Sequence, residues 1–357
     1  MGFWNWLTKT LSTPSPSAPR EPSPSQPNTV SRGGVAVVQA DGDEPAAATT
    51  GEPEVAVWWA PVGVTQTEPL CPACVNLTTE ARALEERLIS HFDGHDLVLP
   101  PMPRVADKVL KRLRDIRSGA AQIAKDLAED PVIAGDVLRM SNSVLYRGAE
   151  KITTLPAAVA RLGTNALRTV MMHQSLRAAV FYAKGETLEF AKLVWANCLA
   201  SGVVMRDLAG LVREREEDAF MAGLLHDIGN VIVLRFAHEQ SKLSHSWLDL
   251  PTFEYLCHES HQELGELIGQ GWQLPPTLQS LISDHHSIPA ADDPLGKDRW
   301  MLMATDMICQ MLGYGPEAEY DLLHSRPFVE LRLSERADVL AWLKKLPQRV
   351  EEAIGEL

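Results

Sequence analysis

Apolar residues recur every three or four positions along the chain from about residue 79 to the C-terminus. Ala81, Leu84, Leu88 and Phe92 form the first such series. This spacing places apolar side chains on one face of a helix, whereas a half-buried strand would alternate at every second position. No stretch of the sequence sustains such alternation, so the pattern predicts an all-α protein.

Breaks in the pattern separate one predicted helix from the next. We expect Asp130-Pro131 to terminate the helix around Ile123, and Gly163 to separate the helices around Leu155 and Leu167. A stripe over about 190–208 places Asn197 on its inward face. The remaining series predict helices beginning after Pro103 and around Ile133, and over about 217–228, 251–270, 276–286, 297–313 and 334–353.

The first part of the chain lacks this periodicity. Residues 12–53 are rich in Ser, Thr, Pro, Ala and Gly, and such a segment buries too little apolar surface to offset the entropy of ordering. We therefore predict that residues 1–53 form a disordered tail. Residues 1–11 could form a short helix that contacts a membrane surface, but a helix of this length is marginal, so a frayed tail is the preferred interpretation.

Net charge and hydropathy narrow the class of function. The 357 residues carry a formal net charge of −14, and an acidic surface repels phosphate backbones, so no nucleic-acid partner is expected. No uninterrupted apolar run approaches the ~20 residues of a membrane-spanning helix, and the N-terminus lacks a secretory signal pattern. A cytoplasmic protein without a transmembrane segment is expected.

The five cysteines agree with a reducing compartment, because their number is odd and three lie within apolar helical patterns. The other two form Cys71-Pro-Ala-Cys74. This spacing would suit half a zinc site or a redox pair, but the sequence offers no second pair of ligands nearby. Two ordinary thiols in a loop is the preferred interpretation.

The candidate chemistry is concentrated at the end of one apolar helix. The run from Phe220 to Asn230 contains the adjacent pair His226-Asp227, and an imidazole beside a carboxylate at this position is typical of HD-type phosphohydrolases. Further residues of ligand type follow downstream. They are His261, His285, His286 and Asp306.

Residues of about 97–310 resemble the HDOD domain, an HD-related output domain of bacterial signalling proteins. The resemblance rests on the order and spacing of several short motifs, each weak alone. They are Leu99-Pro-Pro-Met-Pro103, Asp130-Pro131, Ser141-Asn142-Ser143, Ile152 to Leu155 with Leu162-Gly163, Ala222 to Gly229, His261 to Gly265, Trp272 to Pro275, and His285-His286.

The resemblance implies an architecture of two helical subdomains. We expect a short N-terminal segment with a helix at 54–96, an N-terminal helical subdomain at 97–185, an HD-like subdomain at 186–313 and a helical extension at 314–357. The family also implies a role in relaying signals, usually by contact with other proteins. The expected partners are therefore signalling proteins.

The resemblance also implies a metal site with two replacements. His226, Asp227 and Asp306 match the core ligands of HD enzymes, and His261, His285 and His286 match additional ligands of the HD-GYP phosphodiesterases, which cleave cyclic-di-GMP. Asn197 stands where a further histidine is expected, and an amide is a poor ligand. Asn230 stands where a lysine would neutralise phosphate, and no Gly-Tyr-Pro follows the double histidine.

Two functions therefore stay open. The leading hypothesis is a non-catalytic regulatory module that binds proteins or a ligand, with no catalytic residue and no resident cofactor. The alternative is a phosphohydrolase that uses Fe or Mn and acts on a cyclic dinucleotide (cyclic-di-GMP) or a nucleotide.

Overall fold

The structure is a computed structural model that describes residues 79–93, 99–115, 117–143, 146, 148–182, 185–244, 248–316 and 318–356. Within these ranges every regular element is a helix, so the predicted all-α class is confirmed. The predicted tail at 1–53, the short helix at 1–11 and the Cys71–Cys74 pair lie outside the described residues.

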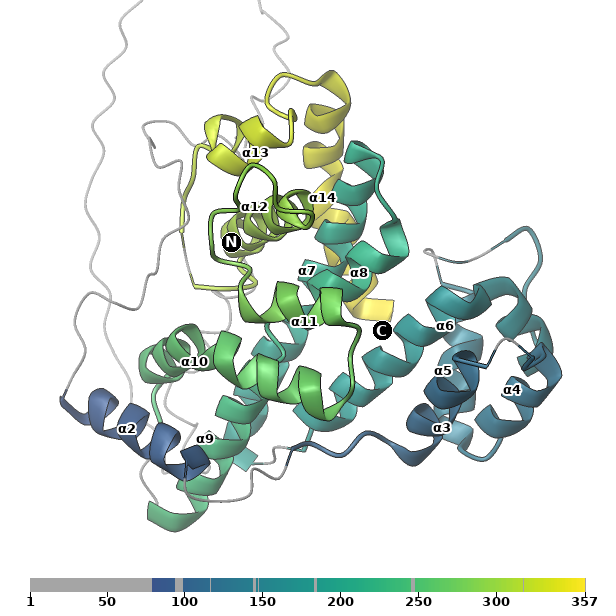
Figure 1. Ribbon diagram of the computed structural model, residues 1–357, viewed down its shortest axis with the longest axis horizontal. Coiled ribbons are helices and arrows are strands. Elements are labelled where there is room, and N and C mark those ends of the chain that lie inside the picture. Colours follow the sequence, from purple (N-terminus) through teal and green to yellow (C-terminus); the bar gives the residue numbers. More distant parts are fainter. Residues whose placement is uncertain are drawn as a thin grey trace, which may run out of the picture.

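The helices follow one another with short connections (Figure 1). They are α2 (Thr79–Asp93), α3 (Arg104–Leu113), α4 (Ala120–Leu127), α5 (Pro131–Ser141), α6 (Leu155–Val180), α7 (Leu188–Val212), α8 (Glu216–Leu225), α9 (Asn230–Ser244), α10 (Leu250–Gly271), α11 (Pro276–Ser283), α12 (Gly296–Leu312), α13 (Arg326–Glu330) and α14 (Ala337–Glu356), with 3-10 turns η2 (Gly185–Thr187) and η3 (Leu322–His324).

The long helix α6 takes part in two separate hydrophobic cores. Its first half packs with α3, α4 and α5 around buried residues that end at Met171. From Met172 onward its apolar side chains belong to the larger core of α7 to α14. Figure 1 shows this arrangement, with α3 to α5 at one end of α6 and the remaining helices around the other. One helix thus fixes the position of the smaller unit against the larger.

Two details of the helix boundaries differ from the sequence-based expectation. Asp130 does not simply end a helix: its carboxylate accepts hydrogen bonds from the backbone N–H groups of Val132 and Ile133, so it is the N-cap of α5. Helix α9 was not predicted, because its apolar run follows the His226-Asp227 segment with no Gly-Pro break long enough to separate two periodic patterns. Gly163 does interrupt α6, with φ of 69° inside the helix.

The sequence was expected to contain no segment that could span a membrane, but two segments pass a test of length and composition. Leu188–Val212 and Glu216–Lys242 are long and apolar enough, by length and composition, to cross a membrane. In the fold, 78% and 83% of their most apolar 18-residue stretches are buried. The first segment is the core helix α7, and the second comprises the core helix α8, the turn after it and most of the core helix α9.

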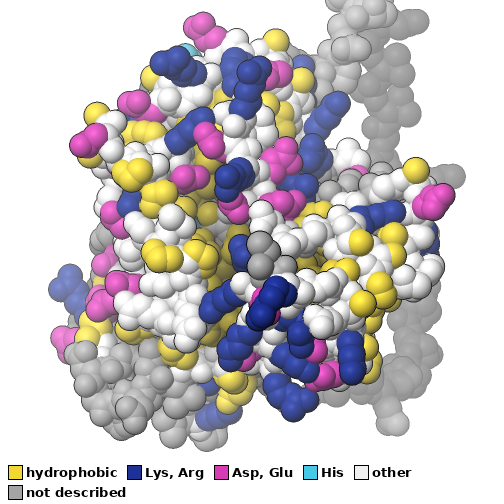
Figure 2. All heavy atoms as spheres, turned by 45° about the vertical axis from the view of Figure 1, so that its right-hand side comes forward, with side chains coloured by type: hydrophobic (Ala, Val, Ile, Leu, Met, Phe, Trp, Pro, Cys, Tyr) yellow, Lys and Arg dark blue, Asp and Glu magenta, His cyan; other side chains and the backbone are white. Residues whose placement is uncertain are grey.

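Basic side chains gather over the smaller unit, on the face that Figure 2 presents. In this unit, α3 carries several basic residues that form ion pairs with nearby carboxylates: Lys108 contacts Glu129 and Asp126, and Arg112 also pairs with Asp126. A strongly acidic chain thus carries a local basic face, most of whose charge is balanced by neighbouring acids.

We expect Asn142, within the Ser141-Asn142-Ser143 motif, to act as a latch in the smaller unit. Its amide donates to the carbonyl oxygens of Leu138 and Ile152 and accepts from the Ile152 N–H, at 2.8–2.9 Å. Asn142→Ala should lower the free energy of unfolding by about 2 kcal/mol, measured by urea denaturation. Asn165→Ala, at an exposed position of α6, is the matched control, and an equal loss in both variants would contradict the latch.

His173 makes the stability dependent on pH. Burial, aided by the charges of Arg177 and Arg139, lowers its pKa from 6.5 to about 3. The unfolded chain then binds more protons between these values, so stability is complete above pH 6.5 and falls as the pH drops. By pH 5 this histidine alone should remove roughly 2 kcal/mol of unfolding free energy.

The measurement is thermal or urea unfolding from pH 8 to pH 5 in the wild type and in His173→Gln. The variant should show the shallower loss, because glutamine does not titrate. Parallel profiles for the two proteins would show that His173 is not the group responsible.

Candidate metal centre

The structure brings all six candidate ligands together. His226 and Asp227 lie in the turn after α8, and His261 lies on α10. His285 and His286 lie in the turn after α11, and Asp306 lies on α12. Two overlapping groups have their ligand atoms within 4.8 Å of one another: His261, His285 and His286 in one, and His226, Asp227 and His285 in the other.

Asp227 is the carboxylate that links the histidines. Its Oδ1 lies 3.6 Å from His261 Nε2 and 3.5 Å from His285 Nε2, and its Oδ2 lies 3.4 Å from His226 Nε2. Asp306 contacts the same cluster from the other side, with Oδ1 3.0 Å from His226 Nε2. Four separate segments of chain therefore meet around these two carboxylates.

Backbone carbonyls orient three of the imidazoles. The Nδ1 atoms of His226, His261 and His285 lie 2.8–3.1 Å from carbonyl oxygens of their own helices or turns. A carbonyl can only accept, so each Nδ1 carries a proton, and in the neutral form of each imidazole the Nε2 atom keeps its lone pair. This arrangement is the one that prepares histidines to bind a metal through Nε2.

The spacing of the nitrogen atoms fits a shared cation. His261 Nε2 lies 3.2 Å from His285 Nε2 and 3.0 Å from His286 Nε2. Lone pairs that face each other repel unless a proton or a cation lies between them. Adjacent ligands about 2.1 Å from one ion stand about 3 Å apart, so nitrogen and carboxylate donors at these distances suit a transition metal such as Fe or Mn.

Glycine allows the turn with the His226-Asp227 pair to reach α10. A Cβ atom at Gly229 would overlap the carbonyl oxygen of His261, and one at Gly223 would overlap backbone of Ser201 on α7. Both glycines lie in the motif from Ala222 to Gly229. Glycine is therefore needed at both positions because the backbones approach closely there. This close approach brings Asp227 within reach of His261.

Two residues that the sequence analysis did not single out hold the double histidine. Arg299, buried on α12, donates to the Asp284 carbonyl oxygen and to Asp293 Oδ2, the latter at 2.9 Å. The Gln262 amide oxygen accepts from the backbone N–H groups of His285 and His286 at 3.3 Å. Only the fold shows that Arg299 serves this turn, because an arginine within an apolar helix gives no such signal in sequence.

The two asparagines that stand at expected histidine and lysine positions line the same cavity. Asn197 and Asn230 line a cavity of about 110 Å³ together with Asp227, His261 and Asp306. Asn197 Nδ2 donates to the Tyr314 carbonyl oxygen at 2.6 Å. Its Oδ1, the Asn230 Oδ1 and the Asp306 Oδ2 are buried, and none accepts a hydrogen bond within the described part of the chain. Three buried oxygens lacking donors again favour a cation here.

The histidines of the cluster have pKa values shifted in opposite directions. Burial disfavours the charged form of His226, but the carboxylates of Asp227 and Asp306 outweigh it and raise its pKa to about 9. Burial lowers the pKa of His285 to about 4 and of His286 to about 3. Burial also opposes ionisation of Asp227, yet the surrounding histidines hold its pKa well below the usual range. Near neutral pH, His285 and His286 are neutral and Asp227 is ionised, and these are the forms that bind metal, whereas the protonated His226 would have to release a proton to become a ligand.

One further acidic group borders the cavity. Burial raises the pKa of Glu254 on α10 to about 7. Glu254 was not expected at the site from the sequence, because a glutamate on a helix is usually solvent-exposed. It adds a third carboxyl group to the cavity beside those of Asp227 and Asp306.

Comparison with known families and structures agrees with the helical arrangement. The HDOD domain family matches residues 99–288. An HDOD domain protein of unknown function from Geobacter sulfurreducens has a TM-score of 0.57 at 22% identity, covering 76% of this chain and 98% of that chain. A protein from Shewanella amazonensis SB2B, named as a candidate metal-dependent phosphohydrolase, has a TM-score of 0.64 at 16% identity, covering 78% and 100%.

A curated relative extends beyond the matched region. An uncharacterized protein of Treponema pallidum (strain Nichols) is 21% identical over 235 residues, which is 62% of this chain and 43% of that protein. The chain thus spans less than half the length of this relative. At these identities the solved structures establish the shared fold alone.

We predict that His261→Ala lowers the affinity for Fe or Mn by at least about tenfold, because it removes the imidazole that faces both His285 and His286. The affinity would be measured by competition with a chromophoric chelator. His324→Ala, at an exposed histidine outside the cluster, should bind metal as the wild type does. Equal affinities in all three proteins would show that the six residues only hydrogen-bond to one another.

Proposed function

The chain belongs to the HDOD domain family, and from this we propose that it is a signalling module that acts by binding. In this proposal the cluster around Asp227 holds a divalent metal, Fe or Mn, and does not hydrolyse phosphate esters. Partner proteins, contacted through the helical surface, receive the signal.

The observation that carries the proposal is the charge of the cavity. Among the described residues that line it there is no lysine or arginine, and Asn230 stands at the position where the related enzymes have lysine. Asp227, Asp306 and Glu254 contribute carboxyl groups instead. Beyond the metal, a phosphate ester would therefore find no cationic side chain to balance its charge, and the carboxylates not neutralised by the metal would oppose both its binding and the charge that develops during phosphoryl transfer.

The size of the cavity leads to the same conclusion. A cavity of about 110 Å³ is well below the roughly 300–1,000 Å³ of typical small-molecule sites. It has room for an ion and a few small groups, whereas a cyclic dinucleotide would require the surrounding helices to separate. Asn197 forms part of the cavity wall, and its amide is held there by the hydrogen bond to the carbonyl oxygen of Tyr314.

The chain's own residues would hold the metal in defined roles. His261, His285 and His286 would supply nitrogen ligands, and Asp227 and Asp306 would supply carboxylate oxygens. A bound divalent ion would provide a Lewis acid and a strong positive charge at the meeting point of α10 and α12. That charge would hold four segments of chain together, so metal binding would change the stability of the fold.

The alternative function is a metal-dependent phosphohydrolase that acts on cyclic-di-GMP or a nucleotide. The convergence of six ligand-type side chains favours it, because a purely structural cluster has no need for so many. The two functions differ in one measurement. Purified protein loaded with Fe or Mn should bind metal stoichiometrically and leave cyclic-di-GMP intact, and turnover that follows metal content would establish the enzyme instead.

We expect the asparagines to account for the missing activity. Asn197→His should increase metal affinity, because it adds an imidazole to a cavity that already contains Asp227 and Asp306. Hydrolysis of cyclic-di-GMP should stay absent in this variant and appear only with Asn230→Lys as well, since lysine restores a cation for the phosphate. Asn165→His, on the exposed face of α6, is the control for an added histidine.

Metal content by mass spectrometry and product formation by chromatography are the two measurements. If Asn197→His leaves metal affinity unchanged, Asn197 does not face the bound ion. If the double variant binds metal and still fails to hydrolyse, the small cavity, and not the missing lysine, is the barrier to activity.

A further inference from the structure

A second hollow, of about 1,170 Å³, shares no lining residue with the cavity at Asp227. It is bordered by the end of α7, the loop before α12, the start of α12 and the helix α13. We call it the basic groove, because five of its lining side chains are cationic. They are Arg213, Lys297, Arg326, Arg332 and Arg336.

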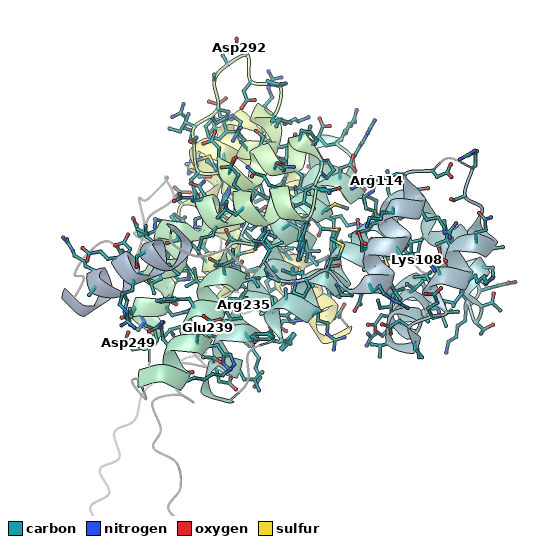
Figure 3. All side chains as sticks on the ribbon, turned by 60° about the horizontal axis from the view of Figure 1, so that its bottom comes forward. Lys108, Arg114, Arg235, Glu239, Asp249 and Asp292 are labelled. Atoms are coloured by element: carbon teal, nitrogen blue, oxygen red, sulfur yellow. The ribbon has the colours of Figure 1, made fainter. Side chains whose placement is uncertain are left out.

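The acidic residues of the groove leave this charge largely uncompensated. Only Asp293 and Glu330 among the lining residues are acidic, and Asp293 is already paired with the buried Arg299 at 2.9 Å. Asp292, at the tip of the same loop, points away from the body of the molecule (Figure 3). In a chain with a net charge of −14, such a concave basic surface is unexpected unless it binds something negative.

Two of the five cationic side chains form hydrogen bonds to the backbone in the groove wall. Lys297 Nζ donates to the Val212 carbonyl oxygen at 3.0 Å, and Arg336 donates to the Leu211 carbonyl oxygen at 3.0 Å. These carbonyls end α7, where a cation is favoured by the helix dipole. Each of the two also pairs with a carboxylate, Glu214 or Asp338.

The other three are available to a ligand. Arg213, Arg326 and Arg332 form no ion pair within the described residues. Arg326 lies over the ring of Trp300, with 5.2 Å from its guanidinium carbon to the ring centroid. The groove therefore presents three guanidinium groups beside an aromatic floor.

The backbone at two of these arginines is in the left-handed conformation. Arg213 follows α7 with φ of 62°, and Arg332 follows α13 with φ of 56°. In both turns the next N–H bonds back to a carbonyl five residues earlier, Glu214 to Ala209 and Leu333 to Phe328. This is the helix-ending turn in which glycine is favoured, because a Cβ atom crowds the left-handed conformation.

The same turn occurs twice elsewhere in the chain, once with glycine and once with glutamine at the left-handed position. After α12 the left-handed position is Gly313, with φ of 83° and the same five-residue bond from Tyr314 to Cys309. Arginine at the two positions that border the groove is less favourable for the fold than glycine. Gln273 after α10, outside the groove, has the same conformation with φ of 52°, so what distinguishes the groove is its charge and its arginines that form no ion pair within the described part of the chain.

We propose that the basic groove is a docking site for an acidic segment of a partner protein. The inference rests on the proposed function in one respect, recognition of a partner, and specifies the chemistry of that partner. Carboxylates of the segment would pair with Arg213, Arg326 and Arg332, and its aliphatic side chains would pack on Trp300 and Leu331.

The dimensions favour a peptide over a small anion. The hollow exceeds the roughly 300–1,000 Å³ of small-molecule sites, and its cations come from three separate segments of chain. A single phosphate would contact only part of this surface. An extended segment with several carboxylates would reach all three arginines.

The test uses the full chain and a fluorescein-labelled oligoglutamate peptide, with binding followed by anisotropy in low and high salt. The wild type should bind the peptide in low salt and lose it in high salt. Arg213→Gly combined with Arg332→Gly should weaken binding by at least about tenfold and keep or raise the melting temperature. Gln273→Gly, at the third non-glycine left-handed position and outside the groove, should raise stability and leave peptide binding unchanged.

The opposite results would overturn the proposal. These are equal binding of an oligolysine peptide, unchanged binding in the double variant, or a loss in Gln273→Gly as large as in the double variant. Binding of pyrophosphate without binding of the peptide would make the groove a small-anion site instead. His261→Ala should retain the peptide, so failure of the metal assay and failure of the groove would be distinguishable.

Discussion

The close backbone contact between the turn after α8 and helix α10 is the constraint on which the site depends. Gly229 touches the backbone of His261 with no room for a side chain. This contact sets Asp227 between His226, His261 and His285 at 3.4–3.6 Å. The buried carboxylate in turn holds three imidazoles whose Nε2 atoms would otherwise repel one another.

The two asparagines change what this arrangement can do. Under the proposed function, the histidines and carboxylates stay in place, and the asparagines stand where the resemblance to HD enzymes implies an imidazole and an ammonium group. Their buried amide oxygens add to the acceptors of the cavity, which becomes more suitable for a cation and less suitable for a phosphate. Metal binding and hydrolysis are therefore separable properties of one fold, and the first does not require the second.

The metal cluster and the basic groove are both connected to α12. Asp306 lies on the side of this helix that faces the cluster, whereas Lys297 and Trp300, nearer its start, border the groove. Arg299 lies between them in sequence and anchors both Asp284, beside the double histidine, and Asp293, in the groove wall. A rigid helix with one arginine thus joins the two places physically.

The sequence by itself determined the helical class, most helix positions and the residue types of the metal cluster, because three- and four-residue spacing and short motifs are local properties. It misjudged Asp130 and missed α9, where capping and a short turn decide the boundary. Only the tertiary structure decided that six ligand-type side chains from four separated segments meet, that Arg299 and Gln262 support them, and that Arg213 and Arg332 face one groove. Those facts depend on which helices pack together, and no periodicity along a single helix encodes the distance to another.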